Sequence, residues 1–294
     1  MRRLAAVLAI GLLACEPERP PKTGLKPPCP PPPEPDHVAV VVGTIGKLHL
    51  VESQYALPRL GDVLAAFKPD LVLVQVRVDP YKDNRLEDAS FEMTYATWLA
   101  KQHGVAVEPI DWFREEDLAA PPPPVEPWDA AELARRETEI LAQPPLFTFE
   151  QANAQETTQR VLGAELADRR FRGGDAVASR RRAWIEDLAI SAVTRHARPK
   201  RVLAYVGVLD RPAATEALTG AGYFAKDPID LVEKAKEKMV GDLSGDLVEE
   251  YKSQLARLRS ADKSNARVAE HAKVLEVVVE KRGACCVPQS SLRP

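Results

Sequence analysis

The sequence has no excess of basic residues and no long hydrophobic run, and each absence excludes a class of protein. Lys and Arg total 40 against 43 Asp and Glu in 294 residues, so no positive field is available to hold a nucleic-acid backbone. The most apolar run covers residues 4–14, which at about 1.5 Å per residue is too short to cross a bilayer comfortably. We therefore expect no nucleic-acid partner and no membrane-spanning helix.

Cysteines and short catalytic motifs are also scarce. The four cysteines are Cys15, Cys29, Cys285 and Cys286, and their spacing is not that of a zinc knuckle. Adjacent cysteines rarely form a disulfide with each other. In an oxidising compartment, a disulfide between Cys29 and either Cys285 or Cys286 is therefore one alternative, and free thiols are the other. The sequence also has no serine nucleophile elbow and no glycine loop that cradles phosphate.

The first residues, "MRRLAAVLAIGLLAC", have the basic start and short apolar run of a secretion signal over residues 1–14. The end of this segment resembles a bacterial lipobox, with Leu12 and Ala14 before Cys15. The resemblance implies cleavage before Cys15 and acylation of that cysteine, and several acyl chains attach a protein durably to a membrane. Glu16 in place of Asp favours the periplasmic face of the outer membrane. The alternative is an ordinary secretion signal with an incidental cysteine.

Residues 15–36 are dominated by proline, which fixes the backbone and removes amide donors. Such a segment extends as polyproline II and forms a semi-rigid stalk. We expect it to link the lipid anchor to a folded domain.

The pattern of the folded region alternates between buried strands and helices, which predicts an α/β fold with a central, largely parallel sheet flanked by helices. The predicted strands are 37–43, 71–78, 105–113 and 201–208. The predicted helices are 57–67, 87–103 and 176–197, and a further helix begins at 213.

The remaining segments predict helices outside this alternation. Residues 121–175 hold a proline cluster and two helices, 130–141 and 150–168, which we interpret as a helical insertion in a domain over 37–225. Residues 226–284 predict a C-terminal helical hairpin before a tail at 285–294. Its apolar stripes contain Leu247, Tyr251, Leu255 and Leu258, then Val268, Ala272, Leu275 and Val279. The sequence allows two interpretations of this hairpin: it packs on the domain, or it forms a coiled coil with a partner protein.

Polar residues follow four of the predicted strands, and the carboxyl ends of parallel strands meet at one edge of a sheet. The candidate site residues are Thr44, His49, Gln75, Asp79, Asp111 and Asp210. Asp111 is the strongest, because its strand end directs it towards the expected cleft.

The ordered motifs "VVVGTIGKLHL", "PDLVLVQVRVDP", "GVAVEPIDWF", "SRRRAWIEDLAISAV" and "KRVLAYVGVLDRPAATEAL" resemble the TraB, GumN and Tiki family, grouped with EreA and ChaN, over roughly residues 38–225. The resemblance implies two Gly-x-x-His loops and a strand-end Glu that support metal-dependent hydrolysis. A bound divalent metal lowers the pKa of water and makes it a nucleophile. The resemblance also implies that Arg181 and Arg182 precede the long helix and meet an anion. On the residues alone, a solvated basic face is the other interpretation.

The chain departs from this pattern at three strand ends. Gly46 and Asp210 stand where the family has histidines. Gln75 replaces the Glu, and its neutral amide lacks the charge and the metal affinity of a carboxylate. His49 lies three residues beyond the expected position. We therefore expect a degenerate site with a binding or scaffold role, for a periplasmic protein or peptide ligand.

Two alternatives remain. One is a metal-dependent, peptidase-like hydrolase with a rearranged site, in which His49, Asp111 and Asp210 are catalytic, His49 and Asp210 hold the metal, and Asp79 assists. The other is a haem-binding lipoprotein similar to ChaN, with His49 as the axial ligand.

Overall fold

Five parallel strands form the centre of the fold in the computed structural model, which describes residues 35–86, 89–114, 126–141, 148–172, 177–232, 243–261 and 266–281. The chain divides into two units, Met1–Glu34 and Pro35–Pro294, and every element described below belongs to the second. The strand order is β3-β2-β4-β1-β5, and every pairing is parallel. The strands are β1 (Val38–Thr44), β2 (Leu71–Arg77), β3 (Ala106–Asp111), β4 (Arg201–Gly207) and β5 (Phe224–Lys226).

The inner strands are apolar on both faces because helices cover both sides of the sheet. Along β1, Val40 and Val42 belong to one core cluster, and Ala39 and Val41 belong to the other. This alternation follows from the two-residue period of a strand. β-Branched residues suit such doubly buried positions, which is why the sequence pattern locates these strands well.

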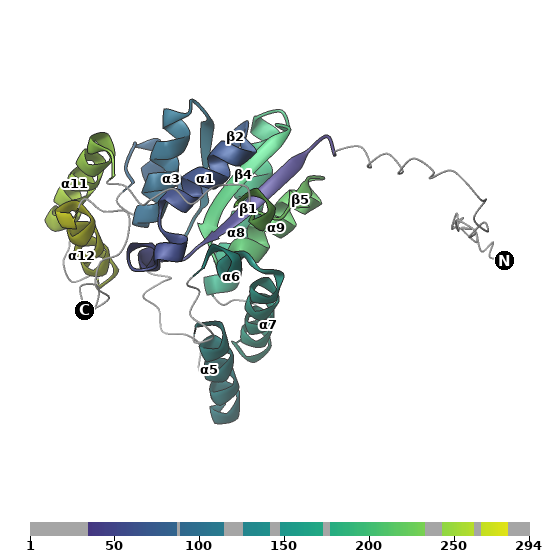
Figure 1. Cartoon of the computed structure of the whole chain (residues 1–294). Coiled ribbons are helices and arrows are strands. Elements are labelled where there is room, and N and C mark those ends of the chain that lie inside the picture. Colours follow the sequence, from purple (N-terminus) through teal and green to yellow (C-terminus); the bar gives the residue numbers. More distant parts are fainter. Residues whose placement is uncertain are drawn as a thin grey trace, which may run out of the picture. The chain divides into compact units, whose positions relative to one another are not determined.

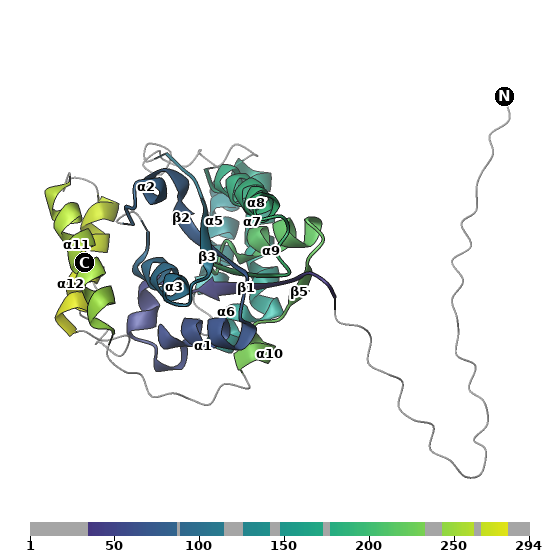
Figure 2. The ribbon, with the colours of Figure 1, turned by 90° about the horizontal axis from the view of Figure 1, so that it is seen from above.

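Helices α1 (Pro58–Phe67) and α3 (Phe91–Gln102) pack on one face of the sheet, and α8 (Val177–Arg195) and α9 (Arg211–Gly220) pack on the other (Figure 2). This arrangement confirms the predicted α/β fold with a parallel sheet. On α8, Ile185 and Ala189 are buried in the core, whereas the neighbouring Trp184 is 43% exposed.

The helical insertion contains α5 (Pro127–Leu141), α6 (Phe149–Asn153) and α7 (Gln155–Arg172), with α5 and α7 beside each other in Figure 1. The single helix expected over 150–168 is two helices, because Ala154 takes an extended conformation between them. α6 begins with a capping box in which the Thr148 side chain accepts a hydrogen bond from the Gln151 backbone N–H. The insertion itself confirms the prediction.

Helices α11 (Gly245–Ser260) and α12 (Ala266–Lys281) form the predicted hairpin, and it packs beside α3 (Figure 1). The Tyr251 hydroxyl donates to the Phe91 carbonyl oxygen at 2.8 Å, and its ring is fully buried in the same core as α1 and α3. The stripe expected on α12 faces this core. Leu275 is buried, and Val268, Ala272 and Val279 are partly buried against the core beside Val274 and Val278.

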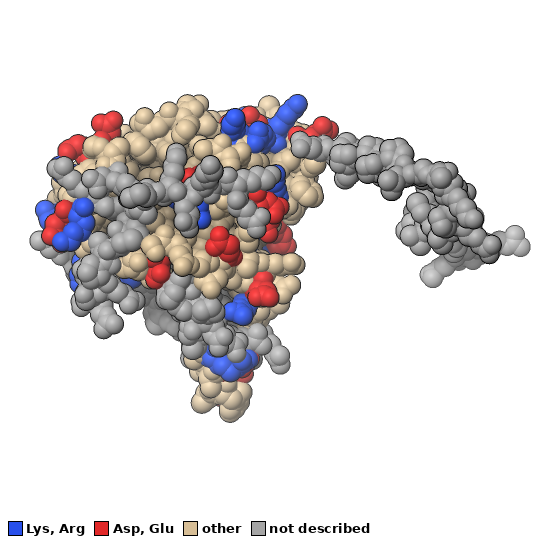
Figure 3. Space-filling model, viewed as in Figure 1, with Lys and Arg blue, Asp and Glu red and all other residues tan. Residues whose placement is uncertain are grey.

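Several short elements escape the sequence pattern because they hold too few residues to show a period. They are η1 (Gly46–Leu50), η2 (Ser53–Tyr55), α2 (Val78–Lys82), β5 and α10 (Ile229–Val232). Within the ranges that the structure describes, no helix has the length and apolar run needed to span a bilayer. On the face seen in Figure 3, the coloured acidic and basic side chains are interspersed.

The topology creates a crevice at one edge of the sheet. The chain leaves β2 towards α3 on one face, whereas it leaves the neighbouring strand β4 towards α9 on the opposite face. Loops that diverge from adjacent strands leave a gap between them, and ligands of open α/β sheets bind there.

Candidate functional site

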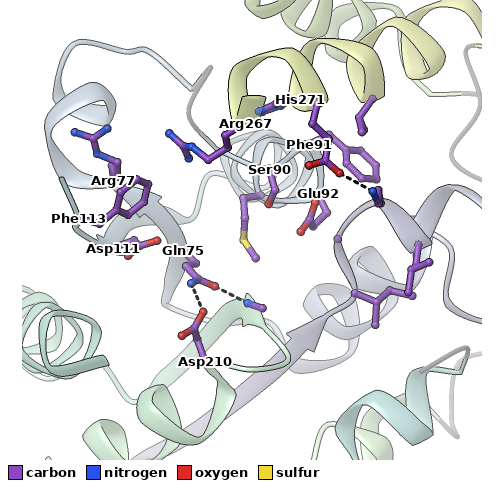
Figure 4. Close-up of a pocket in the computed structure, with 18 of the residues that line it drawn as sticks. Gln75, Arg77, Ser90, Phe91, Glu92, Asp111, Phe113, Asp210, Arg267 and His271 are labelled. Atoms are coloured by element: carbon purple, nitrogen blue, oxygen red, sulfur yellow. Dashed lines mark hydrogen bonds and ion pairs between the residues drawn. The ribbon is translucent and has the colours of Figure 1, made fainter. Parts of the chain in front are cut away.

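A cavity of about 670 Å³ lies at the carboxyl ends of β1, β2, β3 and β4 (Figure 4). This volume falls within the range of roughly 300–1,000 Å³ that small-molecule sites occupy. The loop after β1, the start of α3 and one face of α12 complete its wall. The hairpin therefore contributes to the cavity as well as to the core.

Gln75 closes one side of the cavity by joining β2 to the loop after β4. Its Nε2 donates to Asp210 Oδ2 at 2.5 Å, and its Oε1 accepts from the Gly207 N–H at 2.5 Å (Figure 4). Both ends of the amide are thus engaged. Burial raises the pKa of Asp210 above its ordinary value, although Arg181 and the Gln75 hydrogen bond act in the other direction.

Asp111 and Arg181 form a bidentate ion pair on the adjoining wall. Arg181 donates from Nε to Asp111 Oδ1 at 3.0 Å and from a terminal nitrogen to Oδ2 at 2.5 Å. A second terminal nitrogen lies 3.9 Å from Asp210. Burial alone lowers the pKa of Arg181, but the hydrogen bonds and charge of Asp111 outweigh it and raise that pKa. Both carboxylate oxygens of Asp111 therefore accept a hydrogen bond from the Arg181 guanidinium.

Three arginines of the cavity wall converge on the ring of Phe113, and we call them the arginine cluster. The guanidinium carbons of Arg77, Arg181 and Arg267 lie 4.9, 5.2 and 5.0 Å from the ring centroid. Such distances allow cation–π attraction, which holds a guanidinium over an aromatic face. The cluster joins β2, α8 and α12 around a residue that follows β3.

Glu92 and His271 add buried polar atoms to the cavity wall, Glu92 away from the arginine cluster and His271 beside Arg267 (Figure 4). Glu92 is 3% exposed, and its Oε1 accepts from the Thr44 hydroxyl at 3.4 Å. Glu92 Oε2 and His271 Nε2 have no hydrogen-bond partner among the described residues. Burial raises the pKa of Glu92 against the effect of nearby hydroxyl groups. Burial, then the charge of Arg267, lowers the pKa of His271 to about 4, so its imidazole is neutral at pH 7.

His49 is fully buried in η1 and is absent from the cavity wall. Its Nε2 accepts from the Ile45 N–H at 3.2 Å, and its Nδ1 donates to the Tyr55 carbonyl oxygen at 2.5 Å. Its ring also meets that of Tyr55 edge-on, with centroids 4.5 Å apart. Burial lowers the pKa of His49 to about 4 despite the hydrogen bond to Tyr55. Both nitrogens are occupied, so the geometry does not fit His49 as a ligand of metal or haem.

The other expected site residues divide into two groups. Gln75, Asp111, Asp210 and Arg181 meet at the cavity, whereas Asp79 is exposed on α2 and Arg182 turns away to pair with Glu186 and Glu216 on α8 and α9. Thr44 is buried beside Glu92 without lining the cavity. Cys15, Cys29, Cys285 and Cys286 lie outside the described residues.

The expected metal set does not assemble. No three His, Cys, Asp or Glu side chains within the described ranges are placed to hold a metal ion. Asp111 is tied to Arg181 and Asp210 to Gln75, while His49 is sealed in its loop. The residues present therefore do not fit the metal centre that the resemblance implies.

Sequence reasoning misses much of the cavity wall, including Arg77, Glu92, Phe113, Arg267 and His271. The polar residues of α12 have the pattern of a solvated face, but that face covers the cavity and buries the Nε2 atom of His271. The one available signal is Glu92, a carboxylate in the first turn of a helix that follows a strand.

Comparison of the chain with protein-family models, with curated proteins and with solved structures finds no match in any of the three.

Proposed function

We propose that the domain binds a small ligand in the cavity without metal-dependent hydrolysis. The observation that carries this proposal is the position of His49, whose two nitrogens are occupied by backbone groups of Ile45 and Tyr55. A metal ligand needs a free imidazole nitrogen directed at the ion. The histidine nearest to the position that the resemblance marks cannot supply one without rebuilding its loop.

The other polar groups of the cavity support binding in the same way. Hydrolysis needs a general base or an activated water, and a neutral amide such as Gln75 supplies neither. The carboxylate of Asp111 is engaged by Arg181 on both oxygens. What remains is a preformed, partly apolar cavity with fixed charged groups, which suits recognition.

Metal content tests this proposal directly. The full-length chain, purified without chelator and measured by inductively coupled plasma mass spectrometry, is expected to hold far less than one divalent ion per chain. Asp210→Asn should leave this value unchanged, as should the matched control Asp79→Asn, whose side chain is exposed outside the cavity. About one ion per chain that is lost in Asp210→Asn alone would overturn the proposal and favour a hydrolase. A visible haem band in the purified chain would overturn it in favour of a haem carrier.

We also propose that the chain is a lipoprotein on the periplasmic face of the outer membrane. The support is the sequence alone: the basic start, the short apolar run and Cys15 at the end of it, followed by a proline-rich stalk.

Palmitate labelling tests the anchor. Bacteria that express the full-length chain should incorporate labelled palmitate into it, and Cys15→Ser should abolish both the label and recovery in the membrane fraction. Cys29→Ser is the matched control and should label like the original chain, because it lies beyond the lipobox. Equal labelling of Cys15→Ser would contradict the proposal.

A further inference from the structure

The cavity has two chemically different walls. Arg77, Arg267 and Phe113 lie on one side, and Glu92 lies on the other, with Ser90 between them (Figure 4). Arg181 joins the first side through its contact with the Phe113 ring. A ligand that satisfies both walls must itself have two different polar groups.

The arginine cluster selects an anion. Guanidinium groups stay charged at every physiological pH and present a planar fork that matches carboxylate, sulfonate or phosphate oxygens. Three guanidinium groups within about 5 Å of one ring concentrate this donor capacity in a small part of the wall. Arg181 is held by Asp111, and the guanidinium groups of Arg77 and Arg267 bring further positive charge to the same ring.

The space between the walls is apolar. Phe91 and Met93 from α3, Val274 from α12 and Leu48 from η1 all line it. Apolar surface that a ligand covers contributes roughly 25 cal/mol per Å². An inorganic anion would cover almost none of this surface, whereas an organic body of moderate size would cover much of it.

The opposite wall selects a hydrogen-bond donor. Glu92 Oε2 is buried and has no protein partner within the described part of the chain. A buried acceptor without a partner is costly, so a donor on the ligand gains more here than at an exposed position. His271 Nε2 is a second such atom close to Arg267 in the cavity wall.

We infer that the ligand is an amphipathic organic anion: its acidic group meets the arginine cluster, its apolar body lies against Phe91, Met93 and Val274, and a hydroxyl or amine donor faces Glu92. The inference rests on the proposed binding function. It names the chemical class of ligand, which the proposed function leaves open.

The test compares an anionic and a neutral fluorescent probe of similar shape on the full-length chain. The anion 8-anilinonaphthalene-1-sulfonate should bind, and Arg267→Met should raise its Kd about tenfold, because the loss of one charged hydrogen-bonding group has about that effect. The neutral N-phenyl-1-naphthylamine should bind with the same Kd in both proteins. Arg259→Met is the matched control, since Arg259 lies exposed on α11 away from the cavity, and it should change neither value.

Additional variants and competing ligands test the same inference. Arg267→Lys should restore part of the affinity for the anionic probe, and melting temperatures check that each variant is folded. Decanoate should displace the anionic probe, whereas millimolar inorganic phosphate should not. No binding by the original chain, an equal Kd in Arg267→Met, an equal loss for the neutral probe, or displacement by phosphate would overturn the inference. None of these outcomes involves bound metal, so failure here is distinguishable from failure of the proposed function.

Discussion

His49→Ala is expected to lower the free energy of unfolding by about 3–4 kcal/mol at pH 7, because it removes two buried hydrogen bonds and leaves a cavity. The substitution leaves the Ile45 N–H and the Tyr55 carbonyl oxygen without their side-chain partner inside the core. Urea denaturation followed by circular dichroism measures the change. If His49 were a solvent-facing ligand in an empty site, the same substitution would cost little stability.

The pH dependence of this loss separates a buried neutral imidazole from other causes. The pKa of His49 is about 4 in the folded chain and 6.5 when unperturbed, so the unfolded chain takes up a proton before the folded chain does. The neutral His49 imidazole contributes fully to the free energy of unfolding above pH 6.5, and this contribution falls as the pH drops towards 4. The free energy of unfolding should therefore decrease by about 2 kcal/mol between pH 7 and pH 5. The original chain should lose that stability and His49→Ala should not, so the two curves approach each other in acid.

Other groups also make the stability depend on pH. Their contributions cancel when the free energy of unfolding of His49→Ala is subtracted from that of the original chain at each pH. His271 also has a lowered pKa and destabilises the fold in acid, whereas the raised pKa values of Glu92 and Asp210 act in the opposite direction. These groups are present in both proteins. His103→Ala, at an exposed position after α3, is the matched control and should change stability by less than about 0.5 kcal/mol at each pH. A constant difference between the original chain and His49→Ala from pH 7 to pH 5 would contradict the assignment.

The sheet and part of the cavity can be predicted from the sequence because one local rule governs both. A β-branched run marks a doubly buried strand, and the polar residues at or just beyond its carboxyl end lie at the edge where loops diverge. This rule places Gln75, Asp111 and Asp210 at the cavity, where the structure also has them. His49 obeys a different constraint, since its loop turns into η1 and directs the imidazole to backbone groups.

The other half of the cavity cannot be predicted in this way. Arg267 and His271 lie on α12, and their nearness to β2 and β3 depends on how the hairpin docks on α3. No periodicity encodes that docking. A helix whose second face covers a cavity has the same polar pattern as a helix whose second face meets water. The apolar stripe of α12 can be predicted because it packs against the core, whereas the face that covers the cavity has no signal of its own.

Asp111→Asn is expected to lower the free energy of unfolding by about 2–3 kcal/mol, since removing one partner of a buried ion pair leaves an uncompensated charge. The loss is smaller than for a fully enclosed pair, because the Arg181 side chain is 30% exposed and Asp210 lies 3.9 Å from it. Urea denaturation at pH 7 gives the value. The matched control is Glu108→Gln, whose pair with the exposed Arg195 should contribute at most about 1 kcal/mol.

The double variant Asp111→Asn with Arg181→Met tests whether the Asp111 carboxylate stabilises the fold by pairing with Arg181. The double variant removes the guanidinium that Asp111→Asn leaves without its bidentate partner, and Asp210 keeps its hydrogen bond from Gln75. It should therefore be more stable than Asp111→Asn alone. A double variant that is less stable than the single one would show that Arg181 stabilises the fold mainly through other neighbours, such as Asp210 or Phe113. Recovery would instead mean that the carboxylate serves to hold Arg181 against Phe113. A carboxylate committed to holding a cation cannot also activate water, and that distinguishes the wall of a binding cavity from a hydrolytic centre.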